Sequence, residues 1–178
     1  EVLSDHGREL PRVPLVLQAS YRGQPIVVIN NHYKCCGDGT IDPDDPWDEE
    51  TRRRDANALL HTYVETNYPD RRVVIVGDLN DELSDRPAAN VFNVFLDAPQ
   101  EWCFADLDIA LDPDTWWSYP SWPSHLDHIL INEELFIPLA DPESAVRVLP
   151  IHMMFDGGPG AYDDELSDHL PVALRLKL

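Results

Sequence analysis

The chain is 178 residues long and 43% hydrophobic, which suffices to bury the core of a single domain. It carries 33 Asp and Glu against 13 Lys and Arg, and its formal net charge is −20. This charge argues against duplex DNA as the preferred partner, because non-specific DNA binders gain most of their affinity from Lys and Arg, although the acidity could equally serve solubility or a saline habitat. No run approaches the roughly 20 apolar residues that span a bilayer, so we expect no membrane span.

The chain opens with a predicted β-hairpin. Residues 14–20 and 26–31 are short apolar or alternating runs, and Arg22–Pro25 between them has the composition of a turn. The second run leads into the polar triplet Asn30–His32. An acidic, Pro-rich loop follows over residues 37–46, with carboxylates at the spacing of an EF-hand. A proline stands where that motif needs glycine, so we reject a calcium site of this type.

A helix is predicted after the acidic loop. It starts near Trp47, where Asp45 or Asp48 can cap it. Its apolar side chains recur every three or four residues and should pack against an apolar surface: Ala56, Leu59, Leu60, Tyr63 and Val64. The three arginines at positions 52–54 are expected to point mostly away from that face.

Strands outnumber helices in the rest of the chain. Residues 73–76 form a continuous apolar run that is typical of a buried central strand. A second helix is expected over 87–98, with Val91, Val94 and Phe95 inward. Three further strands are predicted, over residues 126–131, 146–151 and 171–178. This order indicates an α+β fold, a strand-rich sandwich with helices on its outer faces. The tryptophans of the intervening stretch are expected to pack its loops rather than stack on bases: Trp116, Trp117 and Trp122.

The three cysteines leave the redox state open. Cys35 and Cys36 are adjacent, and Cys103 stands alone. They are too few for a zinc site of four cysteines, and no histidine pair at zinc-finger spacing completes one. A disulfide from the pair to Cys103 or to an upstream cysteine would indicate an oxidising compartment, and buried free thiols fit the sequence equally well.

Polar motifs lie at or within the ends of four predicted strands. The strongest is Gly77–Asp81, because a buried strand that runs straight into Gly-Asp-Leu-Asn-Asp delivers two carboxylates and an amide to a rigid strand end. Ser167–His169, just before the last strand, places a hard oxygen ligand beside a group that titrates near neutrality. Asp127 lies inside an apolar strand, where a carboxylate needs a partner such as a histidine ring. Taken singly, such motifs are also ordinary turn and capping chemistry.

The motifs Asn-Asn-His, Gly-Asp-Leu-Asn, Leu-Asp-His and Ser-Asp-His follow one another along the chain in that order. This pattern resembles the endonuclease/exonuclease/phosphatase family, and the resemblance extends from about Pro14 to Leu178. It implies a four-layer α/β/β/α sandwich of the deoxyribonuclease-like type, formed by residues 1–178 as one partial domain, incomplete at the N-terminus. Local motifs such as Trp117–Pro120 are similar to those of the family's bacterial members, which are often exported. This similarity implies an extracellular or periplasmic location.

The resemblance also implies catalytic roles. Asp78 would orient or deprotonate the attacking water, and Asn80 would fix the phosphate or that water. His169, held by Asp127, would present its ring to the scissile phosphate, and His32 would do so from the other side. These roles agree with what phosphoryl transfer requires, namely positioning and donors around developing negative charge.

Metal and substrate contacts follow from the same resemblance. Asp168 would bind a divalent metal, Mg²⁺ first, with Mn²⁺ or Ca²⁺ as alternatives. Four residues would contact the substrate: Asn30, Lys34, Ser118 and Tyr119. Arg52 or Arg53 could add positive charge near the phosphate, although a solvated helix face explains the arginines as well.

One part of the family's pattern is missing. The family's first strands supply an asparagine and a metal-binding glutamate, and residues 1–29 offer neither in a strand context. We therefore expect the N-terminal part of the domain to be a partner of this chain, as a separate, disordered or cleaved segment. Without it the chain should bind metal weakly, because divalent cations need several oxygen ligands.

The predicted function is divalent-metal-dependent hydrolysis of a phosphoester by in-line attack of an activated water. The acidic surface favours a small, lipid-like or single-stranded phosphoester as substrate. The alternatives are a deoxyribonuclease-type endonuclease, with nucleic acid as partner, and a binding module that kept the fold but lost turnover.

Overall fold

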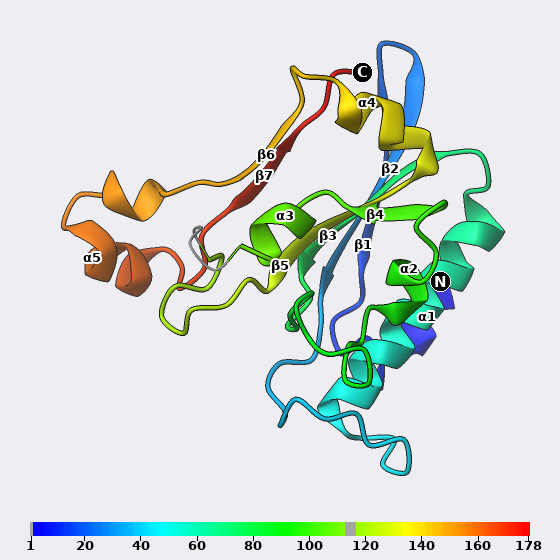
Figure 1. The fold of residues 1–178 in the computed structure, drawn as a ribbon, viewed down its shortest axis with the longest axis horizontal. Coiled ribbons are helices and arrows are strands. Elements are labelled where there is room, and N and C mark those ends of the chain that lie inside the picture. Colours follow the sequence, from blue (N-terminus) through cyan, green and yellow to red (C-terminus); the bar gives the residue numbers. More distant parts are fainter. Residues whose placement is uncertain (1, 113–116) are drawn as a thin grey trace.

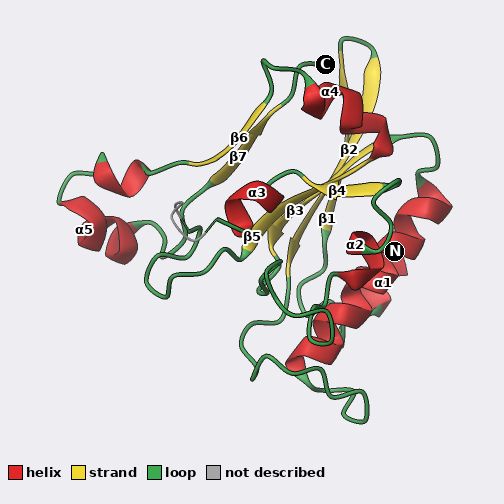
Figure 2. Ribbon diagram, viewed as in Figure 1, coloured by secondary structure: helices red, strands yellow, loops and turns green. Residues whose placement is uncertain are grey.

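The computed structural model describes residues 2–112 and 117–178, which form strands with helices inserted between them (Figures 1 and 2). The strands are β1 (Leu15–Tyr21), β2 (Gln24–His32), β3 (Arg72–Asp78), β4 (Trp102–Phe104), β5 (Asp127–Asn132), β6 (Ala145–Val148) and β7 (Val172–Arg175). The α-helices are α1 (Glu49–Asn67), α2 (Asn93–Leu96), α3 (Leu107–Ala110), α4 (Phe136–Ala140) and α5 (Gly158–Glu165). The 3-10 turns are η1 (Val2–Asp5), η2 (Glu133–Leu135) and η3 (Ile151–Met153). None of the helices in these residues combines the length and hydrophobicity that crossing a bilayer requires.

Five strands form one mixed sheet in the order β1-β2-β3-β5-β4. β1 and β2 make the predicted antiparallel hairpin, β3 runs parallel to β2 after the α1 crossover, and β5 returns antiparallel to β3. The register pairs His32 with Asp78 and Asp78 with Asp127. Three polar residues therefore lie side by side at one end of three adjacent strands.

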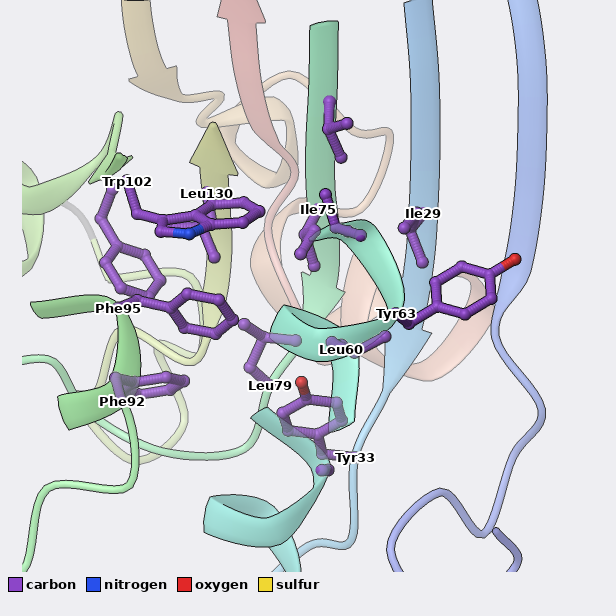
Figure 3. Packing of buried hydrophobic residues seen from close by; sticks show 14 of the residues in the cluster. Ile29, Tyr33, Leu60, Tyr63, Ile75, Leu79, Phe92, Phe95, Trp102 and Leu130 are labelled. Atoms are coloured by element: carbon purple, nitrogen blue, oxygen red, sulfur yellow. The ribbon is translucent and has the colours of Figure 1, made fainter. Parts of the chain in front are cut away.

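Helices α1 and α2 cover one face of this sheet and enclose the main core (Figure 3). Leu60 from α1 and Phe95 from α2 pack with Ile29, Ile75 and Leu130, which come from the three central strands. Full burial of such a side chain contributes about 1.5–3 kcal/mol. The helix face predicted from periodicity is confirmed, and the cap is Asp48, whose carboxylate accepts a hydrogen bond of 2.7 Å from a backbone N–H of the first turn.

The arginines of α1 differ from the prediction that they point away from the core. Arg52 and Arg53 are only 9% and 3% exposed, whereas the side chain of Arg54 is 40% exposed. Position 53 precedes Ala56 and Leu60 by three and seven residues, so the helical repeat places it on the buried stripe. A buried guanidinium needs partners, and those of Arg53 belong to the site described below.

The helix predicted over 87–98 is reduced to the single turn α2. The segment before it bends around Asn90, whose side-chain amide donates to the carbonyl of Leu83 at 3.1 Å and accepts from the N–H of Phe92 at 2.9 Å. An Asn side chain that bonds to nearby backbone competes with the helical hydrogen bonds. Phe95 is buried as predicted.

The ribbon of β6 and β7 lies on the opposite side of the sheet from α1 (Figures 1 and 2). Leu174 and its neighbours on β7 cluster with Val74, Ile129 and Ile131 of the sheet, and a cavity of about 600 Å³ remains between the two layers. The predicted α+β class is confirmed. Within the described residues, the second sheet consists of this ribbon alone.

The boundaries of the last two predicted strands are the least accurate, because β6 and β7 each end three residues earlier than expected. Strand β4 was not predicted, and it contains the buried Trp102. Trp122 is 76% exposed, contrary to the expectation that it packs a loop, and Trp116 lies outside the described residues. The cysteines are free thiols, but the expectation that free thiols would be buried is wrong: Cys35 and Cys36 are exposed, and Cys103 is half-buried.

Candidate active site

Three strand ends and one loop bring four titratable side chains together. His32 ends β2, Asp78 ends β3 and Asp127 begins β5. His32 Nε2 lies 3.4 Å from Asp78 Oδ2. His169, in the loop between α5 and β7, places Nδ1 2.7 Å from Asp127 Oδ2 and Nε2 3.9 Å from Asp78 Oδ2. The structure therefore assembles the residues that the sequence motifs singled out.

The turn after β3 holds Asp78 and Asn80 in fixed positions. Gly77 has a φ of +132°, and a Cβ there would collide with the carbonyl oxygen of Asn31, so only glycine fits. Asp78 Oδ1 accepts a hydrogen bond of 3.0 Å from the N–H of Asn80, and the Asn80 amide donates to the carbonyl of Tyr33 at 3.3 Å. Asn80 itself adopts a left-handed φ of +54°, which Asn tolerates better than most residues. One oxygen of Asp78 is thus occupied, and the other faces the histidines.

The site shifts the pKa values of two of its members. The hydrogen bond to Asp127 raises the pKa of His169, which favours the charged imidazolium. Burial raises the pKa of Asp78, and the negative charge of Asp127 adds to that effect. Neighbouring titratable groups with shifted pKa values in one cleft are typical of functional sites.

The four side chains line one open cleft of about 810 Å³, together with Asn80, Asp168 and Trp122. Asp78, Asp127 and His169 offer ligand atoms within 4.8 Å of one another. Carboxylate oxygens suit Mg²⁺, which keeps several waters and binds proteins through one or two carboxylates. The negative charges of Asp78 and Asp127 repel each other, and a divalent cation bound between them would relieve this repulsion. The donor set therefore fits a hard divalent ion, and the exposed Asp168 lines the same cleft.

The structure places the predicted substrate residues in different surroundings. Ser118 is fully buried, and its hydroxyl accepts the N–H groups of Leu126 and Asp127 at 2.9 and 3.0 Å. It therefore fixes the start of β5, which does not fit a substrate contact. Tyr119 does line the cleft, with its ring centroid 4.9 Å from that of His169.

The other two predicted substrate residues lie outside the lining of the cleft. Asn30 borders the cavity between the sheets. Lys34 donates to the carbonyl of Cys35 at 2.9 Å, and its Nζ lies 3.5 Å from Glu49 Oε1. A phosphate contact by Lys34 would require its side chain to leave these partners.

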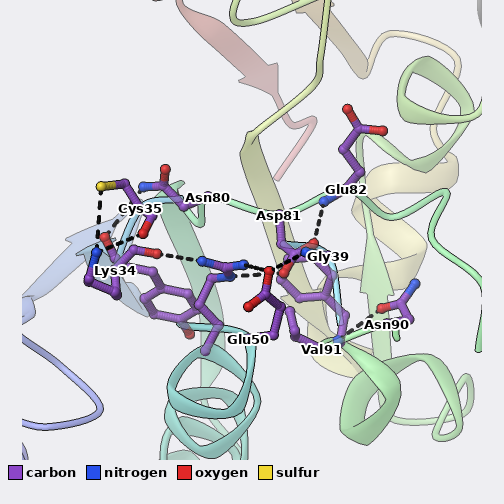
Figure 4. Close-up of polar contacts among 12 residues, drawn as sticks. Lys34, Cys35, Gly39, Glu50, Asn80, Asp81, Glu82, Asn90 and Val91 are labelled. Atoms are coloured by element: carbon purple, nitrogen blue, oxygen red, sulfur yellow. Dashed lines mark hydrogen bonds and ion pairs between the residues drawn. The ribbon is translucent and has the colours of Figure 1, made fainter. Parts of the chain in front are cut away.

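Arg53, which the sequence suggested only as added positive charge near the phosphate or as part of a solvated helix face, has a structural role in the site. Its Nε lies 2.8 Å from Asp81 Oδ2, and its Nη2 lies 3.2 Å from Glu50 Oε1. Its Nη1 donates to the carbonyls of Lys34 and Cys36, both at 2.8 Å. The guanidinium thus joins the loop after β2 to the loop after β3. Figure 4 shows its partners Lys34, Glu50 and Asp81 close together. The sequence signal for this role was the position of Arg53 on the buried stripe of α1.

A second buried network contacts the backbone of the loop after β3. Asp106 Oδ2 is 2.7 Å from His128 Nδ1 and 3.0 Å from His125 Nε2, and His128 Nε2 is 2.9 Å from the carbonyl oxygen of Asp81. A ring nitrogen that meets a carbonyl must donate, so His128 donates from both nitrogens and is charged. Burial lowers the pKa of His128, but Asp106 outweighs it and leaves that pKa raised. The sequence offered no signal for this pairing.

Comparison with known proteins identifies the family and the fold of the chain. A family model for the endonuclease/exonuclease/phosphatase family matches residues 3–169, and no curated protein matches the chain by sequence. Similar solved structures include D. rerio TDP2 complexed with a single-strand DNA product (12% identity, TM-score 0.62, 93% of this chain, 61% of that one). Truncated TDP2 of Caenorhabditis elegans (11%, 0.56, 93% and 59%) and an endonuclease/exonuclease/phosphatase of Bacteroides vulgatus (16%, 0.52, 88% and 51%) share the fold. The chain spans between half and about three fifths of the length of these three. Because the family model covers nearly the whole sequence, the chain belongs to the endonuclease/exonuclease/phosphatase family.

Proposed function

We propose that this chain carries the catalytic machinery of a divalent-metal-dependent phosphoester hydrolase. Members of its family hydrolyse phosphoesters. The observation that carries the proposal is the contact of His169 with both Asp127 and Asp78 at the ends of β3 and β5. This arrangement supplies a charged donor and a carboxylate base on the wall of one cleft.

His169 is placed to stabilise negative charge on the phosphoryl group. Its Nδ1 is held by Asp127 at 2.7 Å, which leaves Nε2 directed toward Asp78 and the cleft. The hydrogen bond to Asp127 raises the pKa of His169, which favours the protonated ring. A protonated imidazole donates a charge-assisted hydrogen bond, and such a bond strengthens as charge develops on the phosphoryl oxygens.

Asp78 is placed to orient and deprotonate the attacking water. Oδ1 is held by the Asn80 N–H, so Oδ2 is the oxygen that can accept the proton. The raised pKa of Asp78 improves it as a base relative to an ordinary aspartate. His32, whose side chain is 45% exposed, lies 3.4 Å from the same oxygen and can meet a second phosphoryl oxygen.

A hard divalent ion would be held by Asp168 together with the neighbouring carboxylates of the cleft, with water completing its shell. When bound, Mg²⁺ would neutralise negative charge on the phosphoryl oxygens. The chain's own residues supply positioning, the proton acceptor and the imidazole donors.

The preferred substrate is a small or single-stranded phosphoester. A net charge of −20 repels the closely spaced phosphates of duplex DNA, and this repulsion grows with the number of phosphates bound. Trp122 and Tyr119 offer aromatic surface at the cleft for a leaving group. Deoxyribonuclease activity on duplex DNA is the second candidate.

The test measures hydrolysis of bis-p-nitrophenyl phosphate and of plasmid DNA, with Mg²⁺ and with EDTA. We expect EDTA to abolish hydrolysis of the diester and Asp78→Asn to lower its rate by about 10²–10⁴-fold. Glu134→Gln, which changes an exposed carboxylate on η2, serves as the matched control and should keep the wild-type rate. Absence of hydrolysis of both substrates with Mg²⁺, or an active Asp78→Asn protein, would contradict the proposal. Binding of a phosphoester without turnover would instead support a binding module.

A further inference from the structure

Cys35 and Cys36 place two thiols on the wall of the cleft. Both residues are exposed, and their Sγ atoms are 2.9 Å apart, with Cys36 donating to Cys35. The pair lines the same cleft as His32 and Asp78. The proposed hydrolysis makes no use of either sulfur.

The backbone around Cys35 and Cys36 is held in place by contacts with side chains of α1. Arg53 donates to the carbonyls of Lys34 and Cys36 at 2.8 Å each. Gly37, with a φ of +113°, follows directly and lies so close to the Glu50 carboxylate that a Cβ would collide with it. Because the loop is already ordered, two bonds to one ligand are made with little further loss of conformational entropy.

The local charge favours the reactive form of one sulfur. The hydrogen bond from Cys36 and the ammonium of Lys34, whose Nζ is 3.8 Å from the sulfur, lower the pKa of the Cys35 thiol. The thiolate is the form that binds metals and attacks electrophiles. Cys103 differs, since burial raises its pKa.

A direct bond between the two sulfurs is geometrically unfavourable. Consecutive Cα atoms across a trans peptide are about 3.8 Å apart, below the range of roughly 4.4–6.8 Å that disulfides span. A bridging ion removes that constraint. Two sulfurs bound at about 2.3 Å to a tetrahedral ion such as Zn²⁺ lie about 3.8 Å apart, so the pair would need to open by only about 1 Å, and the narrower bond angle of pyramidal trivalent arsenic requires a smaller opening.

We propose that Cys35 and Cys36 form a chelating site for a soft, thiophilic metal or metalloid, with trivalent arsenic as its representative. Soft thiolates select such ions, whereas Mg²⁺ selects oxygen, so this site and the carboxylate site take different ions. An ion held here narrows the cleft beside His32 and Asp78 and inhibits hydrolysis. The inhibition rests on the proposed function, and the chelation does not.

Phenylarsine oxide is the probe, because its reaction with a dithiol involves no redox change. Two As–S bonds form, the As=O bond breaks, and the two thiol protons leave with the oxygen as one water. The reduced wild-type chain and the variants Cys35→Ser, Cys36→Ser and Cys103→Ser are compared by intact mass and thiol titration. Hydrolysis of bis-p-nitrophenyl phosphate with Mg²⁺ is measured on the same samples.

We expect one arsenical on the wild type and on Cys103→Ser, with loss of two titratable thiols and at least tenfold slower hydrolysis. A dithiol such as 2,3-dimercaptopropanol should reverse both effects, and an excess of monothiol should not. Cys35→Ser and Cys36→Ser should retain no stable adduct. Equal retention of arsenic by either of these two variants, or an adduct on the wild type without inhibition, would overturn the proposal. If the untreated wild type hydrolyses nothing, the proposed function fails while the mass and thiol data still decide the chelating site.

Discussion

Replacing Arg53 by lysine tests whether the buried guanidinium holds the catalytic loops together. Arg53 makes contacts of 2.8 and 3.2 Å with Asp81 and Glu50, and two of 2.8 Å with backbone carbonyls. Lysine keeps the charge but concentrates its donors on one atom, so it cannot reach partners on opposite sides of the planar group. Loss of two of the three hydrogen bonds that the guanidinium donates, at about 1.5 kcal/mol each, lowers the free energy of unfolding by about 3 kcal/mol. A domain of total stability 5–15 kcal/mol, roughly, survives that loss.

Arg54→Lys is the matched control, because Arg54 is the next residue on α1 and its exposed side chain pairs with the adjacent Asp55. Its effect should stay within about 0.5 kcal/mol. Urea unfolding followed by tryptophan fluorescence measures both variants. Under conditions where both are folded, we expect Arg53→Lys to lower kcat by about tenfold with KM little changed, because small misplacements of reacting groups slow the chemical step.

Two results would refute this reasoning about Arg53. Equal unfolding free energies for Arg53→Lys and Arg54→Lys would show that the contacts at 2.8 Å contribute little to stability. A destabilised Arg53→Lys protein with wild-type kcat would show that the loops keep their catalytic geometry without the guanidinium.

Other substitutions probe the remaining contacts. Asp127→Asn removes the partner that raises the pKa of His169, so that pKa should fall and the alkaline limb of the pH–rate profile should move to lower pH; an unshifted NMR titration of the ring would contradict this. Ser118→Ala deprives two N–H groups of their acceptor and should cost about 1–3 kcal/mol with KM unchanged, whereas a raised KM at wild-type stability would restore a substrate role. Asp106→Asn leaves the charged His128 without its anion and should cost about 3–5 kcal/mol at neutral pH in urea unfolding. Although burial raises the pKa of Asp106, the two histidines hold it below its usual range, so its contribution is complete above about pH 4 and is lost as pH falls further. The stability of Asp106→Asn should therefore change less below pH 4 than that of the wild type, and parallel acid profiles would refute this.

The local sequence determined much of this molecule. The apolar run before Gly77 and the short apolar or alternating runs on either side of Arg22–Pro25 suffice to predict β3 and the first hairpin, because such runs bounded by turn residues are typical of strands. The motifs around Asp78 and His169 indicated the site, since each lies where a strand meets a loop and polar side chains meet a rigid scaffold. These are properties of neighbours in the chain, and they can be read from it directly.

Tertiary structure alone decided which polar groups were partners. Asp127 and His169 are 42 residues apart, and only the pairing of β5 with β3 together with the return of the chain from α5 brings them to 2.7 Å. Asp106 and His128 meet for the same reason, through the β4–β5 pairing, and no periodicity signals it. Arg53 belongs in between: helical spacing placed it on the buried stripe, but only the loops packed against α1 made a buried charge tolerable there. Pairing of buried charges depends on distances across the fold, and local sequence carries no record of those distances.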